Sequence, residues 1–217
     1  LECHYGVPMT GAVLNTLNTR LDAAVLAFSL DHGEAKILIV DREFSATAKA
    51  ALALATVKPL VIDYDDPEFG GTGERIGTLD YETFLAEGDP QFERAAPLDE
   101  WDAISLNYTS GTTGDPKGVM LTHDMVLRAA FSSVIAGAFE ENRRMLFAMP
   151  MYHVFGYAEC LLAVLFVGGA IIPHLVFDAA EMLNAAERHR ATELIAVPMM
   201  TSKLIETARV RGFDSSH

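Results

Sequence analysis

The segment YTSGTTGDPKG at residues 108–118 is the most informative part of this chain: three glycines, five hydroxyl-bearing side chains and one lysine fall within eleven positions. Glycines let backbone N–H groups turn toward an anion, hydroxyls add neutral donors, and Lys117 supplies a compact positive charge. The apolar pattern of residues 103–108 predicts a buried strand before this loop. The loop therefore starts at the carboxyl end of a strand, where open α/β sheets bind ligands, and we expect it to hold the phosphates of a nucleoside triphosphate.

Three commoner motifs fit the glycine-containing segments of this chain poorly. Lys117 is neither preceded by glycine nor followed by Ser or Thr, as a Walker loop requires. In the other glycine cluster, at residues 70–73, Ile76 stands where the last glycine of a dinucleotide fingerprint should fall. Ser110 lacks the flanking glycines of a nucleophile elbow, although a serine amidohydrolase that uses Ser110 stays an alternative.

Together with residues 119–123 (VMLTH), the loop resembles the signature of the AMP-forming acyl and aryl ligases. This superfamily includes acyl-CoA synthetases, adenylation domains of peptide synthetases and firefly-type luciferases. Residues 150–156 (PMYHVFG) resemble a second segment of the family, and residues 11–21 (GAVLNTLNTRL) resemble its branch of fatty-acid and short-acid CoA ligases. The resemblance covers nearly the whole chain. It implies an α/β fold of layered, mostly parallel sheets flanked by helices, as part of the large N-terminal domain of adenylate-forming enzymes.

The resemblance also implies roles for individual residues. Hydroxyls and backbone N–H groups of the loop would hold the β- and γ-phosphates, and the implied nucleotide-binding residues are Thr109, Ser110, Gly111, Thr112, Thr113, Gly114 and Lys117. Lys117 would add a catalytic cation, and Thr109 matches the position that can help to hold Mg²⁺. His153 matches the second implied catalytic residue, a histidine of the carboxylate pocket, where we expect a hydrogen-bond donor instead of a general base.

By the same resemblance, the full-length parent joins a carboxylic acid, with a fatty acid favoured, to the α-phosphorus of ATP and then to coenzyme A. Such a reaction must shield the repulsion between two anions and stabilise the departing pyrophosphate, which is mainly electrostatic work. The implied ligands are ATP, Mg²⁺, coenzyme A and the acid. Two alternatives stay open: an adenylation domain that loads a carrier protein, and a nucleotide-binding module without turnover.

Several parts of the family pattern are not found in this chain. They are the Tyr-Gly-x-Thr-Glu segment whose glutamate completes the Mg²⁺ site, the aspartate that holds the ribose, and the C-terminal domain with its catalytic lysine. We therefore expect residues 1–217 to be a partial N-terminal domain that is inactive alone.

Some histidines also have a purely structural interpretation. Without its motif, His153 would be interpreted as a structural residue with satisfied hydrogen bonds, and the structural interpretation of His123 places it beside a helix N-cap. The remaining histidines show no ligand spacing, so zinc is not predicted.

Composition limits the other functional classes. With 50% hydrophobic and 21% charged residues, the chain is predicted to be globular. Its net charge of −14 argues against nucleic-acid binding, and much of that charge lies in residues 63–102, which hold thirteen acidic residues and two arginines. The longest apolar run, at residues 160–173, is too short for a membrane span, and two cysteines make no disulfide framework. We expect a cytoplasmic protein with reduced thiols, and among oligomeric states a homodimer is one candidate.

Helix and strand patterns alternate along the chain, which is typical of parallel α/β layers. Predicted helices occupy residues 21–32, 44–55, 81–86, 124–137, 155–167, 179–190 and 199–209. Predicted strands occupy residues 35–40, 58–62, 103–108, 145–149, 170–172 and 193–197, with one more after the loop. This order predicts a first α/β portion at residues 1–62, an acidic surface excursion at 63–102 and a second α/β portion at 103–217 that carries the loop.

Overall fold

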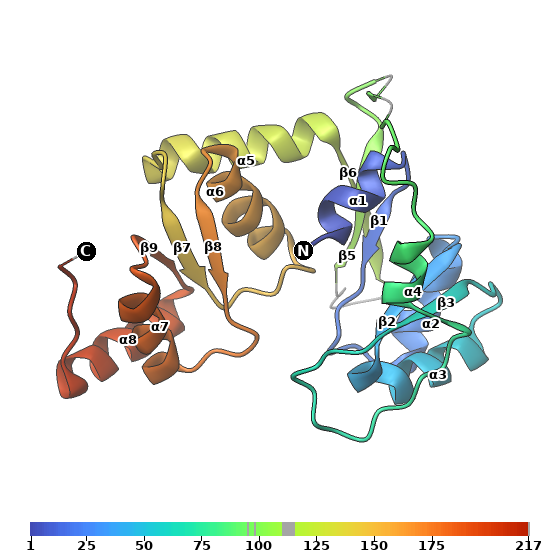
Figure 1. Ribbon diagram of the computed structural model, residues 1–217, viewed down its shortest axis with the longest axis horizontal. Helices are drawn as coiled ribbons and strands as arrows, with labels where there is room; N and C mark the ends of the chain where they lie inside the picture. Colours follow the sequence, from blue (N-terminus) through green and yellow to red (C-terminus); the bar gives the residue numbers. More distant parts are fainter. Residues whose placement is uncertain (95, 98, 110–115, 217) are drawn as a thin grey trace. The chain divides into compact units, whose positions relative to one another are not determined.

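A computed structural model describes residues 1–94, 96–97, 99–109 and 116–216 of the protein (Figure 1). The chain forms two compact units, and each is described by itself. The N-terminal unit comprises Glu2–Leu98 and Ala103–Met120, and the C-terminal unit comprises Leu1, Asp99–Asp102 and Leu121–His217. The chain passes from the N-terminal to the C-terminal unit after Met120, which is later than the acidic excursion at residues 63–102. The three portions expected from the sequence stay a prediction.

One sheet of the N-terminal unit is entirely parallel. Its order is β2 (Ile37–Asp41), β3 (Leu60–Tyr64) and β4 (Leu79–Asp80). Helices α2 (Ala23–His32) and α3 (Ser45–Leu54) pack together through small side chains, with Ala27 and Leu30 of α2 buried against Ala51. The carboxylate of Asp22 accepts a hydrogen bond from the Val25 N–H and so caps α2.

The second sheet of this unit carries the glycine-rich motif. Its order is β1 (Leu14–Thr16), β5 (Ala103–Thr109) and β6 (Lys117–Thr122), and β1 is parallel to β5. Asn107 of β5 lies opposite Thr16 of β1 and donates to its hydroxyl at 2.7 Å. The short helix α1 (Cys3–Met9) precedes β1.

The C-terminal unit is a sheet with helices on both faces (Figure 1). Its strand order is β8 (Ala170–Pro173), β7 (Arg144–Phe147) and β9 (Glu193–Ile195), and both pairings are parallel. Along β7 the side chains alternate: Leu146 packs with α7 (Ala179–His189) and α8 (Pro198–Arg211), whereas Met145 and Phe147 pack with Cys160 and Val164. Helix α5 (His123–Gly137) leads into this unit from β6.

The predicted α/β class is confirmed, and every predicted helix and strand overlaps an observed one. The strand predicted at residues 58–62 begins later, at Leu60, because Pro59 has no N–H for the ladder. The helix predicted at residues 155–167 is π-helical over Phe155–Leu162 and continues as α6 (Ala163–Phe166). Helix α1 and strand β1 were not predicted.

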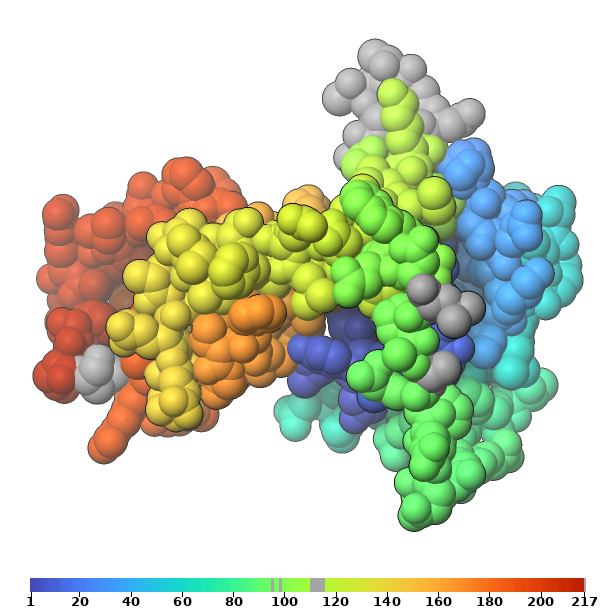
Figure 2. All heavy atoms as spheres, turned by 90° about the horizontal axis from the view of Figure 1, so that it is seen from above, coloured from blue at the N-terminus to red at the C-terminus, as the bar shows by residue number. Residues whose placement is uncertain are grey.

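The acidic excursion is more structured than its composition indicates. It contains the predicted helix α4 (Tyr81–Ala86), but it also contributes the unpredicted strand β4. Asp63 is buried, and its carboxylate accepts hydrogen bonds from the N–H groups of Ile76 and Gly77 at 2.9 and 2.8 Å. Residues 85–94, in contrast, are exposed, and Figure 2 shows this green segment on the surface of the N-terminal unit.

Among the described residues, no helix combines the length and the hydropathy of a membrane span.

Candidate functional site

The structure brings together the two ends of the glycine-rich motif. Strand β5 ends at Thr109 and β6 begins at Lys117. The Thr109 hydroxyl lies 3.5 Å from the Lys117 carbonyl oxygen, a long hydrogen bond between neighbouring strand ends. Both side chains are exposed, so a hydroxyl donor and an ammonium group face solvent at one edge of this sheet. The other predicted phosphate-binding residues, at positions 110–114, lie outside the described residues.

Local packing explains why these strand ends lie where they do. Ile104 and Ser105 of β5 are buried, and the Ser105 hydroxyl donates to the side-chain carbonyl of Asn107. On β6, a Cβ at Gly118 would lie 3.0 Å from a Leu106 methyl carbon and 3.4 Å from the Tyr108 ring. Glycine at this position therefore lets β6 pass close to the side chains of β5.

Tyr108, the first motif residue, belongs to a small aromatic cluster with α2. Its hydroxyl lies 2.9 Å from Nδ1 of His32. The Phe28 and His32 rings stack with centroids 5.3 Å apart, and the Tyr108 ring meets the His32 and Phe28 rings edge-on at 5.8 and 6.3 Å. Burial raises the pKa of Tyr108, so the phenol keeps its proton near neutral pH.

The second motif segment lies in the C-terminal unit, before the π-helix. The His153 N–H donates to the Pro150 carbonyl at 3.1 Å, which closes a tight turn. Nδ1 of His153 accepts a hydrogen bond from the Phe155 N–H at 3.2 Å. A neutral His153 ring therefore carries its proton on Nε2, and because the residue is exposed this N–H can donate to a ligand.

Gly156 is required for this turn. A Cβ at Gly156 would lie 2.3 Å from the Pro150 carbonyl oxygen and 3.0 Å from that of Met149. Both neighbours are backbone atoms that cannot rotate away. Phe155, the neighbour of Gly156, packs against the core cluster of Met145 and Phe147, so at least part of its role is structural.

His123 is the first residue of α5, next to the N-cap Thr122. The Thr122 hydroxyl accepts from the Met125 N–H at 3.2 Å, while the His123 N–H donates to the Asp102 carbonyl at 3.3 Å. This placement agrees with the structural interpretation of His123.

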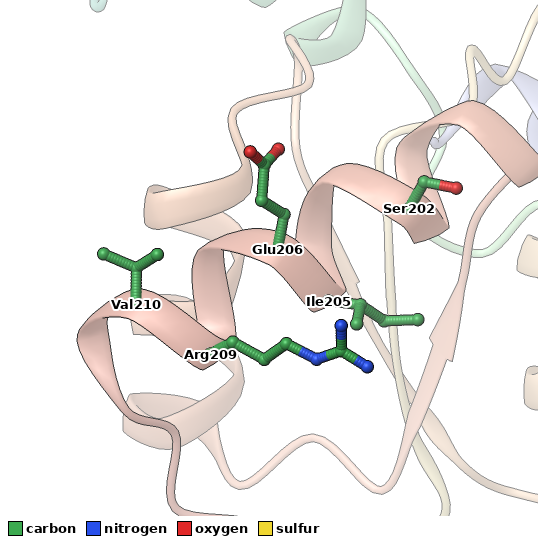
Figure 3. Close-up of a pocket in the computed structure, with 5 residues that line it drawn as sticks. All are labelled: Ser202, Ile205, Glu206, Arg209 and Val210. Atoms are coloured by element: carbon green, nitrogen blue, oxygen red, sulfur yellow. The ribbon is translucent and has the colours of Figure 1, made fainter.

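One surface hollow contains no residue of either motif. Figure 3 shows its lining, which comes from a single helix, α8: Ser202, Ile205, Glu206, Arg209 and Val210. A depression along one helix face has no enclosing walls and no predicted site residue, so we assign no chemistry to it.

His32 and Phe28 are the residues of this region that the sequence did not indicate. They are separated from Tyr108 by 76 and 80 positions, respectively. No local motif marks them, and only the packing of α2 beside β5 shows their proximity to Tyr108.

Sheets flanked by helices, with a glycine-rich motif that begins at the end of strand β5, are typical of α/β proteins that bind nucleotides. Comparison with protein families narrows this class. Residues 1–216 match the family described as AMP-binding enzyme, and the chain belongs to that family.

The relatives include named CoA ligases. The chain is 36% identical over 220 residues to the peroxisomal acetate/butyrate–CoA ligase AAE7 of Arabidopsis thaliana, a match that covers 96% of this chain and 38% of the relative. It is 35% identical over 215 residues to the acetate–CoA ligase CCL3 of Humulus lupulus, covering 94% of this chain and 38% of that one. The chain thus spans well under half the length of the curated relatives it matches.

Solved structures show the same fold. The anthranilate CoA ligase AuaEII, in complex with anthranoyl-AMP, superposes with a TM-score of 0.84 at 24% identity over 98% of this chain and 40% of its own. The o-succinylbenzoate CoA synthetase of Bacillus subtilis, in complex with ATP and a magnesium ion, gives a TM-score of 0.71 at 26% identity over 90% of this chain and 36% of its own.

Proposed function

We propose that the whole protein activates a carboxylic acid in two steps. A carboxylate oxygen of the acid attacks the α-phosphorus of ATP, the bond from that phosphorus to the bridging oxygen breaks, and pyrophosphate leaves. The thiol of coenzyme A then attacks the carbonyl carbon of the acyl-adenylate, loses its proton, and displaces AMP to give a thioester.

The observation that carries this proposal is the pairing of Thr109 and Lys117 at one sheet edge in a chain of the AMP-binding family. The exposed Lys117 ammonium can lower the charge repulsion between ATP and the incoming carboxylate, and the Thr109 hydroxyl can donate to a phosphate or bind Mg²⁺. We assign the remaining phosphate contacts to the motif residues that lie between Thr109 and Lys117 in the sequence, namely Ser110, Gly111, Thr112, Thr113 and Gly114. Because oriented donors act on charge that develops in the transition state, this edge would serve mainly the first step.

We assign His153 to the acid. Its Nδ1 is occupied by the Phe155 N–H, which leaves Nε2–H as a donor to a carboxylate oxygen. A histidine held in this way orients the acid and does not need to remove a proton, since a carboxylate has none to give.

The names of the relatives favour a short acid within the wider class of carboxylic acids. Two of them are named for acetate or butyrate, and another is named butyrate–CoA ligase. We therefore propose acetate or butyrate before a long-chain fatty acid as the substrate. Mg²⁺ and coenzyme A are proposed as partners of the same reaction, with a carrier protein as the alternative acceptor.

Acid-dependent exchange of labelled pyrophosphate into ATP tests the first step in the whole protein. We expect exchange with acetate or butyrate, and a decrease of about ten- to a hundred-fold in Lys117→Ala, because one preorganised charge is lost. Lys36→Ala, which removes another exposed lysine of the same unit, should leave exchange unchanged. No exchange with any carboxylic acid would overturn the proposal.

Three further expectations rest on this function. Residues 1–217 alone should not complete the reaction, which a comparison with the whole protein measures directly. Cytoplasmic location is proposed, although a relative is named peroxisomal, and imaging of a tagged whole protein separates the two. A homodimer is the third expectation, and sedimentation of the whole protein tests it.

A further inference from the structure

Tyr108 is held from two sides within the N-terminal unit. On one side, its hydroxyl meets Nδ1 of His32 at 2.9 Å and its ring meets the rings of His32 and Phe28. On the other side, the backbone of Gly118 passes close enough that an added Cβ would lie 3.4 Å from the Tyr108 ring. This side chain of β5 therefore contacts α2 and lies close to the backbone of β6.

The end of α2 that carries His32 is itself anchored. The Asp31 carboxylate accepts hydrogen bonds from the Val57 N–H at 2.8 Å and from the Thr56 N–H at 2.8 and 3.0 Å. These backbone donors lower the pKa of Asp31, so the carboxylate stays charged and bonded at neutral pH. His32 thus projects from a helix end that is fastened to the segment after α3.

We propose that His32 is a positioning residue for the nucleotide site: through Tyr108 it fixes the strand ends from which Thr109 and Lys117 meet the phosphates of ATP. This inference rests on the proposed function and extends it to a residue of α2, outside both motifs. His32 itself has no contact with the nucleotide in this scheme.

The size of the effect follows from the geometry. The hydrogen bond joins groups near the surface, so its removal should change the folding equilibrium little. Thr109 follows Tyr108 directly, however, and displacements well under 1 Å in phosphate contacts are enough to weaken binding. The expected signature is therefore a higher KM for ATP with nearly unchanged stability.

Four variants of the whole protein test this. His32→Leu and Tyr108→Phe each remove one partner, and the double variant removes both. His32→Asn is the conservative replacement, because an asparagine amide can place a polar atom near the position of Nδ1. His189→Leu is the matched control, since His189 is likewise an exposed histidine that ends a helix.

Two measurements are made on each variant. In pyrophosphate exchange, we expect the KM for ATP to rise about five-fold in His32→Leu and Tyr108→Phe, no further in the double variant, and less than about two-fold in His32→Asn. The KM for the acid should not change. Without nucleotide, backbone amides of residues 106–109 and 117–120 should exchange hydrogen faster in His32→Leu than in wild type or His189→Leu.

The outcomes are separable. Faster amide exchange with an unchanged KM for ATP would show a purely structural pair and overturn the inference. Wild-type values in both measurements would overturn it as well. If the wild-type protein itself showed no pyrophosphate exchange, the proposed function would fail and the nucleotide role of His32 with it, while amide exchange would still report whether His32 holds the strand ends.

Discussion

Replacing Gly156 with alanine should destabilise the C-terminal unit. The added Cβ would lie 2.3 Å from the Pro150 carbonyl oxygen and 2.7 Å from its carbonyl carbon, and both atoms belong to the turn that holds His153. Ordinary carbon–oxygen contacts are about 3.3 Å or longer, so the π-helix and the turn must separate by about 1 Å. Alanine gains about 0.5–1 kcal/mol over glycine inside a helix, which offsets only part of this strain.

Overpacking of this kind costs about 1–3 kcal/mol, and for a chain of this length each kcal/mol lowers Tm by about 2–4 °C. We therefore expect a decrease in Tm of about 2–12 °C, measured by thermal unfolding followed by circular dichroism. The KM for the acid should rise at the same time, because the His153 turn moves with the helix. Gly6→Ala is the control: nothing lies within 4 Å of its added Cβ in α1, so Tm should stay constant or rise slightly. An unchanged Tm in Gly156→Ala would refute the steric argument.

Two further predictions concern buried groups. Asp63→Ala leaves the N–H groups of Ile76 and Gly77 without their acceptor, so urea denaturation should show a loss of about 2 kcal/mol; wild-type stability would contradict the anchoring role. Burial, followed by the charge of Glu159, raises the pKa of Cys160 from 9.0 to about 12. The thiol of the unfolded chain ionises first, so this contribution to stability is complete below pH 9 and is lost as pH rises toward 12. Over that pH range, the free energy of unfolding obtained from denaturation curves should fall more steeply with pH for wild type than for Cys160→Ala. Equal slopes would contradict this prediction.

The sequence predicted the elements whose patterns are local. Helix α4 (Tyr81–Ala86) was predicted with its observed bounds, and the predicted range for α7 was only one residue longer than the observed helix. Apolar periodicity and helix-ending residues carry enough information for such elements.

Elements that depend on distant partners were missed. Strand β4 has two residues, Leu79 and Asp80, and it exists because they pair with Ile62 and Asp63 of β3. Strand β1 likewise forms against β5, across a long stretch of chain. A two- or three-residue strand has no periodicity of its own, so pairing decides it.

The candidate site shows the same limit. Thr109, Lys117 and His153 were predicted as site residues because a compact sequence pattern surrounds each of them, and their roles stay predictions. The segment after His153 is π-helical, and Gly156 lies close to the Pro150 carbonyl; no residue pattern in the sequence expresses either feature. His32 contacts Tyr108 only because α2 packs beside β5.

A crystal structure of the whole protein with a nonhydrolysable ATP analogue and Mg²⁺ tests the central claim most directly. We predict the β- and γ-phosphates of the analogue within hydrogen-bond distance of the Thr109 hydroxyl or the Lys117 ammonium. Phosphates bound elsewhere, with both of these groups facing solvent, would contradict it.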